Sequence, residues 1–400
     1  MKIIDGGVTA PEGFFATGVA CGIKKDGKMD LALVCSEDTA AAAGVFTKNV
    51  VKGHSLLVTM DNIKNGYANA VVINSGNANA CVGEKGYNDA LEIASHTASL
   101  LDCDPSMILL GSTGVIGQPL NVEAIKKGVE EAVENMTPEG GKDAAAAIMT
   151  TDLIDKQIAV EIELKGTKVK VGGMAKGSGM IHPNMATMIG IITTDADISK
   201  TFLQRALRDC VKRSFNRISV DGDTSVCDMV LILANGQAEN DSIIIDDASY
   251  AEFKKALDFV CSYLSKLIAK DGEGATKLVE IEAKGASSEE DAYKIVCSVA
   301  KSPLVKTAIF GEDANWGRII TAAGYSGANF DPTKVDIYLG DLLVCKDGCG
   351  LPFDEEQAKN ILKKEEIKIT IDLNLNNFSD RMWTCDFSYD YIKINGSYRS

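Results

Sequence analysis

The sequence lacks the features of a membrane protein and of a nucleic-acid-binding protein. No run approaches the ~18 consecutive apolar residues of a membrane-spanning helix, and residues 1–7 lack the apolar core of a signal peptide. No block of lysine and arginine occurs, and the net charge of −15 disfavours a polyanionic partner. We therefore expect a protein that stays in the cytoplasm, with neither a membrane nor a nucleic acid as a partner.

Disulfide bonds and metal sites also have little support. The 11 cysteines are an odd number without a regular spacing, which fits reduced thiols better than disulfides. Cys345 and Cys349 are the one close pair, and a zinc ion there would need two more ligands. The three histidines, His54, His96 and His182, are distant in sequence and lack ligand spacing. We expect no metal.

The chain is long enough for two or three domains, since 400 residues exceed the roughly 100–200 residues of one domain. Residues 87–101 and 253–268 carry apolar residues at helical spacing. Residues 158–164 and 367–373 alternate apolar and polar residues, which predicts strands. Helices and strands are mixed throughout, without an internal repeat. This mixture predicts an α+β fold rather than a regular βαβ relay.

Residues 174–190 set a threonine between a glycine-rich loop and a short apolar run. Gly177 and Gly179 favour a loop, whereas the apolar residues 188–192 predict a buried strand. Thr187 would then open that strand. Because threonine commonly begins strands through its β-propensity alone, a purely structural role is one interpretation of this position.

A nucleophilic role for Thr187 is the other interpretation. Attack of its hydroxyl on the Ala186 carbonyl, an N-to-O acyl shift and hydrolysis would split the backbone between the two residues. Thr187 would become a new N-terminal residue, whose α-amino group has a reference pKa of roughly 7.7–8. That amino group could take the proton from the adjacent hydroxyl, as in other enzymes with an N-terminal threonine nucleophile.

Residues 111–117 follow a fully apolar predicted strand at 107–110 and offer donors for a negatively charged oxygen. Thr113 supplies a hydroxyl and Gly114 a backbone N–H, and glycine allows close approach of the backbone. The segment therefore predicts an oxyanion hole for a tetrahedral intermediate. An ordinary tight turn fits the same residues.

Two further segments suggest phosphate chemistry. Residues 271–277 are rich in glycine, but the order of strand, GxxxxGK[ST] and helix that defines a phosphate-binding loop is absent. Residues 218–225 resemble the DxDxT motif of aspartate-based phosphatases, which bind Mg²⁺. The run before that motif is not the four-residue apolar strand that such a site needs, and its partner lysine cannot be placed.

Seven segments agree in order and spacing with the pattern of one family. They are residues 74–80, 111–117, 147–152, 176–188, 302–308, 314–318 and 390–399. Through them the sequence resembles the ornithine acetyltransferase family, also called the arginine biosynthesis bifunctional protein or glutamate N-acetyltransferase. The similarity at 176–188 is nearly residue for residue, and the resemblance extends from the first residues to the last.

The resemblance implies an acetyl transfer in two steps. Thr187 would take the acetyl group from N2-acetyl-L-ornithine as an ester, release ornithine, and pass the group to L-glutamate for arginine biosynthesis. Thr113 and Gly114 would form the oxyanion hole, and no metal or organic cofactor is implied. The residues implied to contact substrate are Thr150, Lys176, Thr187, Glu273, Asn395 and Ser400. Thr151 stands next to Thr150, so the alignment can slip by one there.

The resemblance also implies an α-β-β-α sandwich of the self-processing N-terminal-nucleophile-like type, with a smaller C-terminal α/β domain. Cleavage before Thr187 would give an α fragment of residues 1–186 and a β fragment of residues 187–400. Residues 187–280 would complete the sandwich, and residues 281–400 would form the smaller domain. Two copies of each fragment would assemble as a heterotetramer.

One segment departs from the family pattern. Where the family usually has Thr-Asn-Asp-Thr after Ser225, this chain has Val226, Cys227, Asp228 and Met229, which lack one amide and two hydroxyls. The departure bears on the shape of the pocket and on the range of acetyl donors. Some members of the family also accept acetyl-CoA. The net charge of −15 and the absence of a phosphate loop lead us to expect a poor acetyl-CoA donor activity or none.

Two other classes of function stay open. An amidohydrolase or aminopeptidase of the same self-processing superfamily would use water in place of glutamate. A non-catalytic binding protein would keep the fold in an uncleaved chain, which the mass of the purified protein would reveal.

Overall fold

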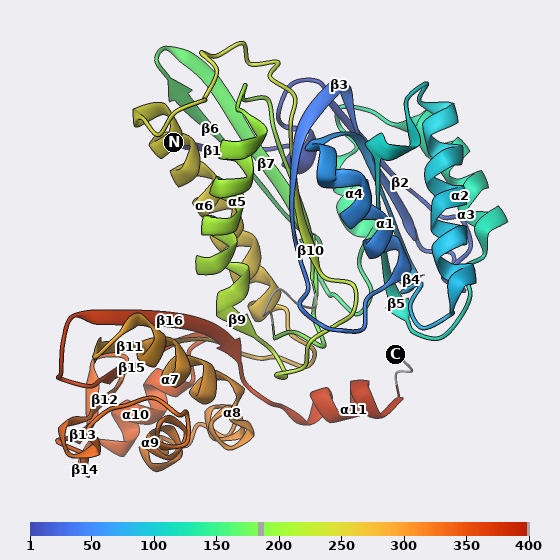
Figure 1. Ribbon diagram of the computed structural model, residues 1–400. Coiled ribbons are helices and arrows are strands. Elements are labelled where there is room, and N and C mark those ends of the chain that lie inside the picture. The colour runs from blue at the N-terminus through green and yellow to red at the C-terminus, as the bar shows by residue number, and fades with distance from the viewer. Residues whose placement is uncertain (183–187, 398–400) are drawn as a thin grey trace. The chain divides into compact units, whose positions relative to one another are not determined.

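The computed structural model describes residues 1–182 and 188–397 of the chain (Figure 1). These residues form two compact units, which we call unit 1 and unit 2. Unit 1 contains residues 1–182, 188–216 and 223–268, and unit 2 contains residues 217–222 and 269–397.

Unit 1 is built on a mixed sheet with the strand order β1-β6-β7-β8-β10-β3-β4-β5, and β2 pairs with β3. Its strands are β1 (Lys2–Ile4), β2 (Phe14–Val19), β3 (Leu31–Phe46), β4 (Tyr67–Asn77), β5 (Ile108–Val115), β6 (Lys156–Leu164), β7 (Thr167–Lys176), β8 (Ile189–Thr194) and β10 (Met229–Ala234). The central strands β8 and β10 are parallel, and every residue in them is buried. A strand with no face in water consists of a continuous apolar run, and the strand predicted at 188–192 is confirmed as β8.

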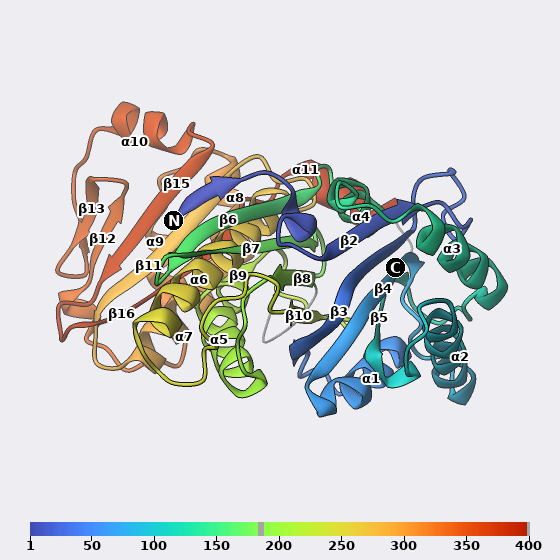
Figure 2. The same ribbon diagram turned by 90° about the horizontal axis from the view of Figure 1, so that it is seen from above.

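Strand β3 belongs to two layers of this sheet. Its residues 31–36 pair with β2, whereas its residues 41–46 pair with β10. Its pairing with β4 shifts register between Cys35 and Ala40, where the strand passes from one layer to the other. One layer therefore contains β2, β4 and β5, and the other contains β10, β8, β7, β6 and β1 (Figure 2).

Helices cover the outer faces of both layers (Figure 2). Those on the layer of β2, β4 and β5 are α1 (His54–Asn62), α2 (Glu84–Leu100) and α3 (Val122–Asn135), and those on the other layer are α5 (Lys200–Arg213) and α6 (Ala248–Lys270). Buried apolar side chains from strands of both layers and from the short helix α4 (Gly141–Ala147) fill the space between the layers. This arrangement confirms the predicted α-β-β-α sandwich.

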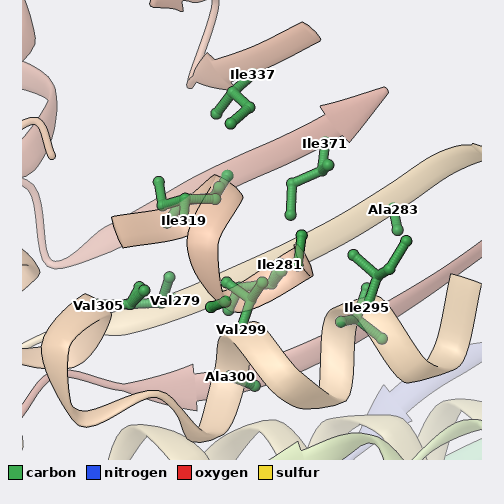
Figure 3. Close-up of a cluster of buried hydrophobic side chains, with 14 of the residues drawn as sticks. Val279, Ile281, Ala283, Ile295, Val299, Ala300, Val305, Ile319, Ile337 and Ile371 are labelled. Atoms are coloured by element: carbon green, nitrogen blue, oxygen red, sulfur yellow. The ribbon is translucent and has the colours of Figure 1, made fainter. Parts of the chain in front are cut away.

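Unit 2 is a smaller α/β unit on a sheet with the order β14-β13-β12-β15-β11-β16-β9. Its strands are β9 (Ile218–Ser219), β11 (Leu278–Ala286), β12 (Asp336–Leu339), β13 (Leu342–Lys346), β14 (Cys349–Gly350), β15 (Glu366–Asp372) and β16 (Phe378–Cys385). Its helices are α7 (Glu289–Lys301), α8 (Pro303–Phe310), α9 (Trp316–Gly324), α10 (Glu355–Leu362) and α11 (Tyr389–Ser397). Figure 3 shows Ile281 of β11 and Val299 of α7 pointing toward each other in its core. The predicted C-terminal α/β part of the fold class is confirmed.

No helix in the two described ranges is both long and apolar enough to cross a membrane.

Candidate functional site

The predicted oxyanion loop lies where the parallel strands β4 and β5 end together. Gly114 of β5 is directly opposite Gly76 of β4. Its φ of 130° lies in the region that favours glycine, and a β-carbon on Gly114 would stand 2.4 Å from the carbonyl carbon of Gly76. Glycine is therefore required at position 114, and its backbone N–H follows directly on Thr113.

A buried network of hydrogen bonds connects this loop to the end of β4 and to α1. The Ser112 hydroxyl donates to Asn74 Oδ1 at 2.6 Å and lies 2.7 Å from Ser55 Oγ. The Asn74 amide donates in turn to the Asn77 carbonyl oxygen at 2.9 Å, and Asn79 Nδ2 donates to Ser55 Oγ at 3.1 Å. These linked hydrogen bonds hold the ends of β4 and β5 together. The sequence indicated residues 74–80 only as part of a family pattern and did not predict this supporting role.

Lys176 brings two of the predicted site threonines together. It is the last residue of β7 and only 5% exposed. Its Nζ donates to Thr150 Oγ1 at 2.8 Å and to Thr113 Oγ1 at 3.4 Å. Its backbone pairs with Ile189, the second residue after Thr187, at the start of β8. We call Thr113, Thr150 and Lys176 the ammonium–hydroxyl cluster.

A second buried ionisable group lies beside this cluster. Asp152 Oδ1 accepts hydrogen bonds from Lys156 Nζ at 2.8 Å and from the Gly177 amide at 2.7 Å. Burial opposes ionisation of this carboxyl, but the charges of Lys176 and Lys156, together with its hydrogen bonds, hold the pKa of Asp152 below its ordinary value. Asp152 is therefore a buried carboxylate, which sequence reasoning noted only within the segment 147–152.

The pKa of Asp228 is shifted in the opposite direction to that of Asp152. Burial raises its pKa well above the ordinary value, although a hydrogen bond from the Met188 backbone, the charge of Lys176 and the Thr47 hydroxyl act against that shift. Its Oδ2 atom has no hydrogen-bond partner among the residues that the structure describes. Burial therefore favours the protonated form of the Asp228 carboxyl, which lies at the backbone of Met188.

The segment that departs from the family pattern forms a small apolar cluster in unit 1. Val226 and Cys227 are each 7% exposed and pack with Ala78 and Ala80, next to the end of β4. Burial also raises the pKa of the Cys227 thiol, which disfavours its reactive thiolate form. The side chains that replace the family's hydroxyl and amide groups here are therefore packing groups.

Unit 2 holds two of the remaining predicted substrate contacts together. Glu273, in the loop between α6 and β11, is 6% exposed, and its Oε2 accepts a hydrogen bond from Asn395 Nδ2 of α11 at 2.8 Å. Gly274 brings the two segments close, since a β-carbon there would stand 2.4 Å from the Tyr391 amide nitrogen. Ala186, Thr187 and Ser400 lie outside the described residues.

The rival interpretations of two segments lose support. In the loop 271–277, Asp386 Oδ1 accepts from the backbone amides of Thr276 and Lys277 at 2.8 and 2.9 Å. A carboxylate thus occupies the donors that a phosphate would need. The DxDxT-like segment follows β9, which is only two residues long. Within the described ranges, no three His, Cys, Asp or Glu side chains are grouped to hold a metal ion.

Comparison with known proteins identifies the family. Residues 15–400 match the sequence pattern of the ArgJ family. The chain belongs to the ArgJ family. It is 51% identical over 402 residues to the arginine biosynthesis bifunctional protein ArgJ of Symbiobacterium thermophilum, and the match covers 100% of both chains. The resemblance stated from the sequence motifs is confirmed.

Two solved structures of similar proteins are also found. The arginine biosynthesis bifunctional protein of Bacillus halodurans is 44% identical, with a TM-score of 0.51, over 52% of this chain and 98% of that chain. An ornithine acetyltransferase of Mycobacterium tuberculosis, solved in complex with ornithine, is 42% identical, with a TM-score of 0.43, over 46% of this chain and 98% of that chain. Family membership confirms the prediction of an arginine-biosynthesis enzyme of the ornithine acetyltransferase type.

Proposed function

We propose that Thr187 carries the acetyl group in a two-step transfer from N2-acetyl-L-ornithine to L-glutamate. The observation that carries this proposal is the pairing of Lys176 with Ile189. It brings the chain two residues beyond Thr187 against the strand end that holds the ammonium–hydroxyl cluster. A threonine nucleophile, oxyanion donors and a cation are the groups that acyl transfer from an amino-acid amide requires.

In the first step, the Thr187 hydroxyl attacks the acetyl carbonyl carbon of acetylornithine. The Thr187 α-amino group takes the hydroxyl proton and delivers it to the departing ornithine nitrogen as the C–N bond breaks. The Thr113 hydroxyl and the Gly114 N–H donate to the oxyanion of the intermediate. In the second step, the glutamate amine attacks the acetyl ester, N-acetylglutamate leaves, and the threonine hydroxyl is restored.

The predicted substrate contacts divide by charge. Lys176 and Thr150 offer an ammonium and a hydroxyl to the α-carboxylate of the amino acid. Glu273, held by Asn395, offers a carboxylate to the side-chain ammonium of ornithine. Ser400 is the last of the proposed contacts. Ornithine and glutamate share the α-carboxylate, so Lys176 and Thr150 could serve both, whereas the Glu273 carboxylate suits the side chain of ornithine alone.

The proposed nucleophile requires self-cleavage before Thr187, into fragments of residues 1–186 and 187–400. The solved Bacillus halodurans chain corresponds to 52% of this chain with 98% of its own length. A fragment that begins at Thr187 would contain 214 of the 400 residues, a similar proportion. In the second fragment, 187–280 would complete the sandwich and 281–400 would form the smaller domain. Two copies of each fragment would form a heterotetramer, and the cytoplasmic location stays a prediction.

Mass spectrometry tests this proposal directly. The purified protein should give two masses, with Thr187 at the start of the second fragment, and Thr187→Ala should give one intact, inactive chain. Incubation with N2-acetylornithine alone should then add one acetyl group to the 187–400 fragment. An intact and fully active wild-type chain, or an acetyl group on the other fragment, would overturn the assignment. Release of acetate without glutamate would instead indicate a hydrolase.

A further inference from the structure

Asp152 makes contacts on both sides of the ammonium–hydroxyl cluster. Its Oδ2 accepts from the backbone amide of Thr150 at 3.0 Å. Its Oδ1 accepts from the backbone amide of Gly177, the residue after Lys176, at 2.7 Å. One carboxylate therefore fixes the backbone at Thr150 and next to Lys176, whose side chains meet at 2.8 Å.

The segment that carries Asp152 is anchored at further points within unit 1. Ser75 Oγ, at the end of β4, donates to the Ala147 carbonyl oxygen at 2.5 Å. Lys24 Nζ donates to the Met149 carbonyl oxygen at 2.8 Å. Asp152 is thus the point at which an already anchored turn is tied to the end of β7.

Two ammonium groups lie near the Asp152 carboxylate. The side chains of Asp152 and Lys156 are both 0% exposed and form an ion pair at 2.8 Å. Lys176 adds a second ammonium that is almost fully buried. Within ranges 1–182 and 188–397, two ammonium groups thus lie near this one carboxylate, and such a balance favours a bound carboxylate or a developing oxyanion at Lys176.

We propose that Asp152 is a positioning residue for acetyl transfer: it aligns Thr150 and Lys176 through their backbones, and Lys156 is the counterion that lets it do so in a buried position. This inference rests on the proposed function of the cluster. Asp152 does not itself touch the substrate in this proposal. It acts through the two residues that it holds.

Asparagine cannot replace the aspartate in this role. A carboxylate is an acceptor at both oxygens, and here each oxygen receives a backbone N–H. The amide of asparagine has one acceptor atom and one donor group. In Asp152→Asn a donor would therefore face either the Thr150 amide or the Gly177 amide, and that backbone would move away.

A purely stabilising ion pair is the competing explanation, and a double variant separates the two. Asp152→Asn alone leaves the buried Lys156 ammonium without the Asp152 carboxylate as its counterion, which destabilises the fold. Asp152→Asn with Lys156→Met removes both charges and should recover the part of the melting temperature that the buried lysine costs without its counterion. Because the donor–donor conflict persists, its kcat/KM for acetyl transfer should stay about 10- to 100-fold below wild type.

Asp195 offers a matched control in the same unit. It is also buried, and its carboxylate accepts from the backbone amides of Lys170 at 2.7 Å and Glu12 at 3.1 Å. Lys170 is six residues before Lys176 on β7, roughly 20 Å away along an extended strand. Asp195→Asn should lower the melting temperature and leave kcat/KM unchanged.

The experiment measures the melting temperature and kcat/KM of the cleaved protein for wild type, both Asp152 variants and Asp195→Asn. Low transfer in a double variant with a partly recovered melting temperature, beside normal transfer in Asp195→Asn, is the expected result. Wild-type transfer in Asp152→Asn, or joint recovery of stability and transfer in the double variant, would overturn the positioning role alone. A wild-type protein without transfer activity would overturn the proposed function itself.

Discussion

Gly114 and Gly76 face each other across the parallel strands β4 and β5 so closely that no side chain fits at position 114. A β-carbon there would also stand 2.7 Å from the Asn77 amide nitrogen. These contacts are with backbone atoms, which cannot rotate away as a flexible side chain would. The geometry of the proposed oxyanion donor is therefore coupled to the end of β4.

Gly114→Ala should therefore disrupt the oxyanion hole. We expect kcat/KM for acetyl transfer to fall by about 100-fold or more, the usual cost of losing an oxyanion donor. Gly117→Ala is the control, because Gly117 also has a positive φ, of 79°, but has open space around its β-carbon position. Steady-state kinetics of both variants check this, and equal losses in the two would show that backbone strain alone is responsible.

A pair of valine substitutions tests which threonine serves the site. Thr150 Oγ1 accepts from Lys176 Nζ, so Thr150→Val removes a hydrogen bond to a charged group. The expected loss in kcat/KM is roughly tenfold or more. Thr151→Val, which differs by one position, should stay close to wild type. The reverse order of the two variants would mean that Thr151 is the residue that contacts the substrate.

Asp228 should make the stability of the protein depend on pH. Because its folded-state pKa is raised by burial, the folded protein binds a proton that the unfolded chain releases above pH of about 4. Stability is then lost as the pH rises from that value toward the folded-state pKa. Asp228→Asn removes this loss and should raise the melting temperature by roughly 2–4 °C at pH 8 but not at pH 4.

Calorimetry at both pH values, in a Thr187→Ala background that keeps one covalent chain, measures this difference. The groups near the carboxyl are the Lys176 ammonium, the Thr47 hydroxyl and the Met188 backbone. A difference between Asp228→Asn and its parent that is the same at pH 4 and pH 8 would mean that Asp228 does not titrate as described.

We expect the choice of acetyl donor to follow from the composition of the chain and from one apolar cluster. We expect kcat/KM with N2-acetylornithine to exceed that with acetyl-CoA by roughly tenfold or more. The reasons are the net charge of −15 and the apolar packing of Val226 and Cys227 near the end of β4. Relatives carry the word "bifunctional" in their names. Assays with each donor at saturating glutamate decide the matter, and comparable values would contradict the expectation.

The sequence predicted the elements of the fold better than their arrangement. The apolar run at 188–192 and the alternation at 158–164 became β8 and β6, because their periodicity follows directly from which faces are buried. The division of β3 between two layers was not predicted, although the polar residues 36–39 interrupt its apolar run at the point where the pairing changes. It depends on partners that are distant in the sequence.

The same limit applies to the candidate site. The resemblance named Thr113, Thr150 and Lys176 but did not show that their side chains are in contact. Thr113 and Thr150 are 63 and 26 positions from Lys176 in the sequence. The sheet and the turn before β6 bring them together. The roles of Asp152 and Ser112 have no local sequence signal at all. Each depends on hydrogen bonds to residues that are distant in the sequence, Gly177 for Asp152 and Asn74 for Ser112.

The strand order has a mechanical consequence for a chain cut before Thr187. Strands β8 and β10 would belong to the second fragment, yet they lie between β7 and β3 of the first. Pulling the fragments apart would break the ladders on both sides and expose two strands in which all residues are buried. Cleavage would therefore create a new chain end at Thr187 without releasing either fragment. The two polypeptides would remain associated through their shared sheet and would separate only on unfolding.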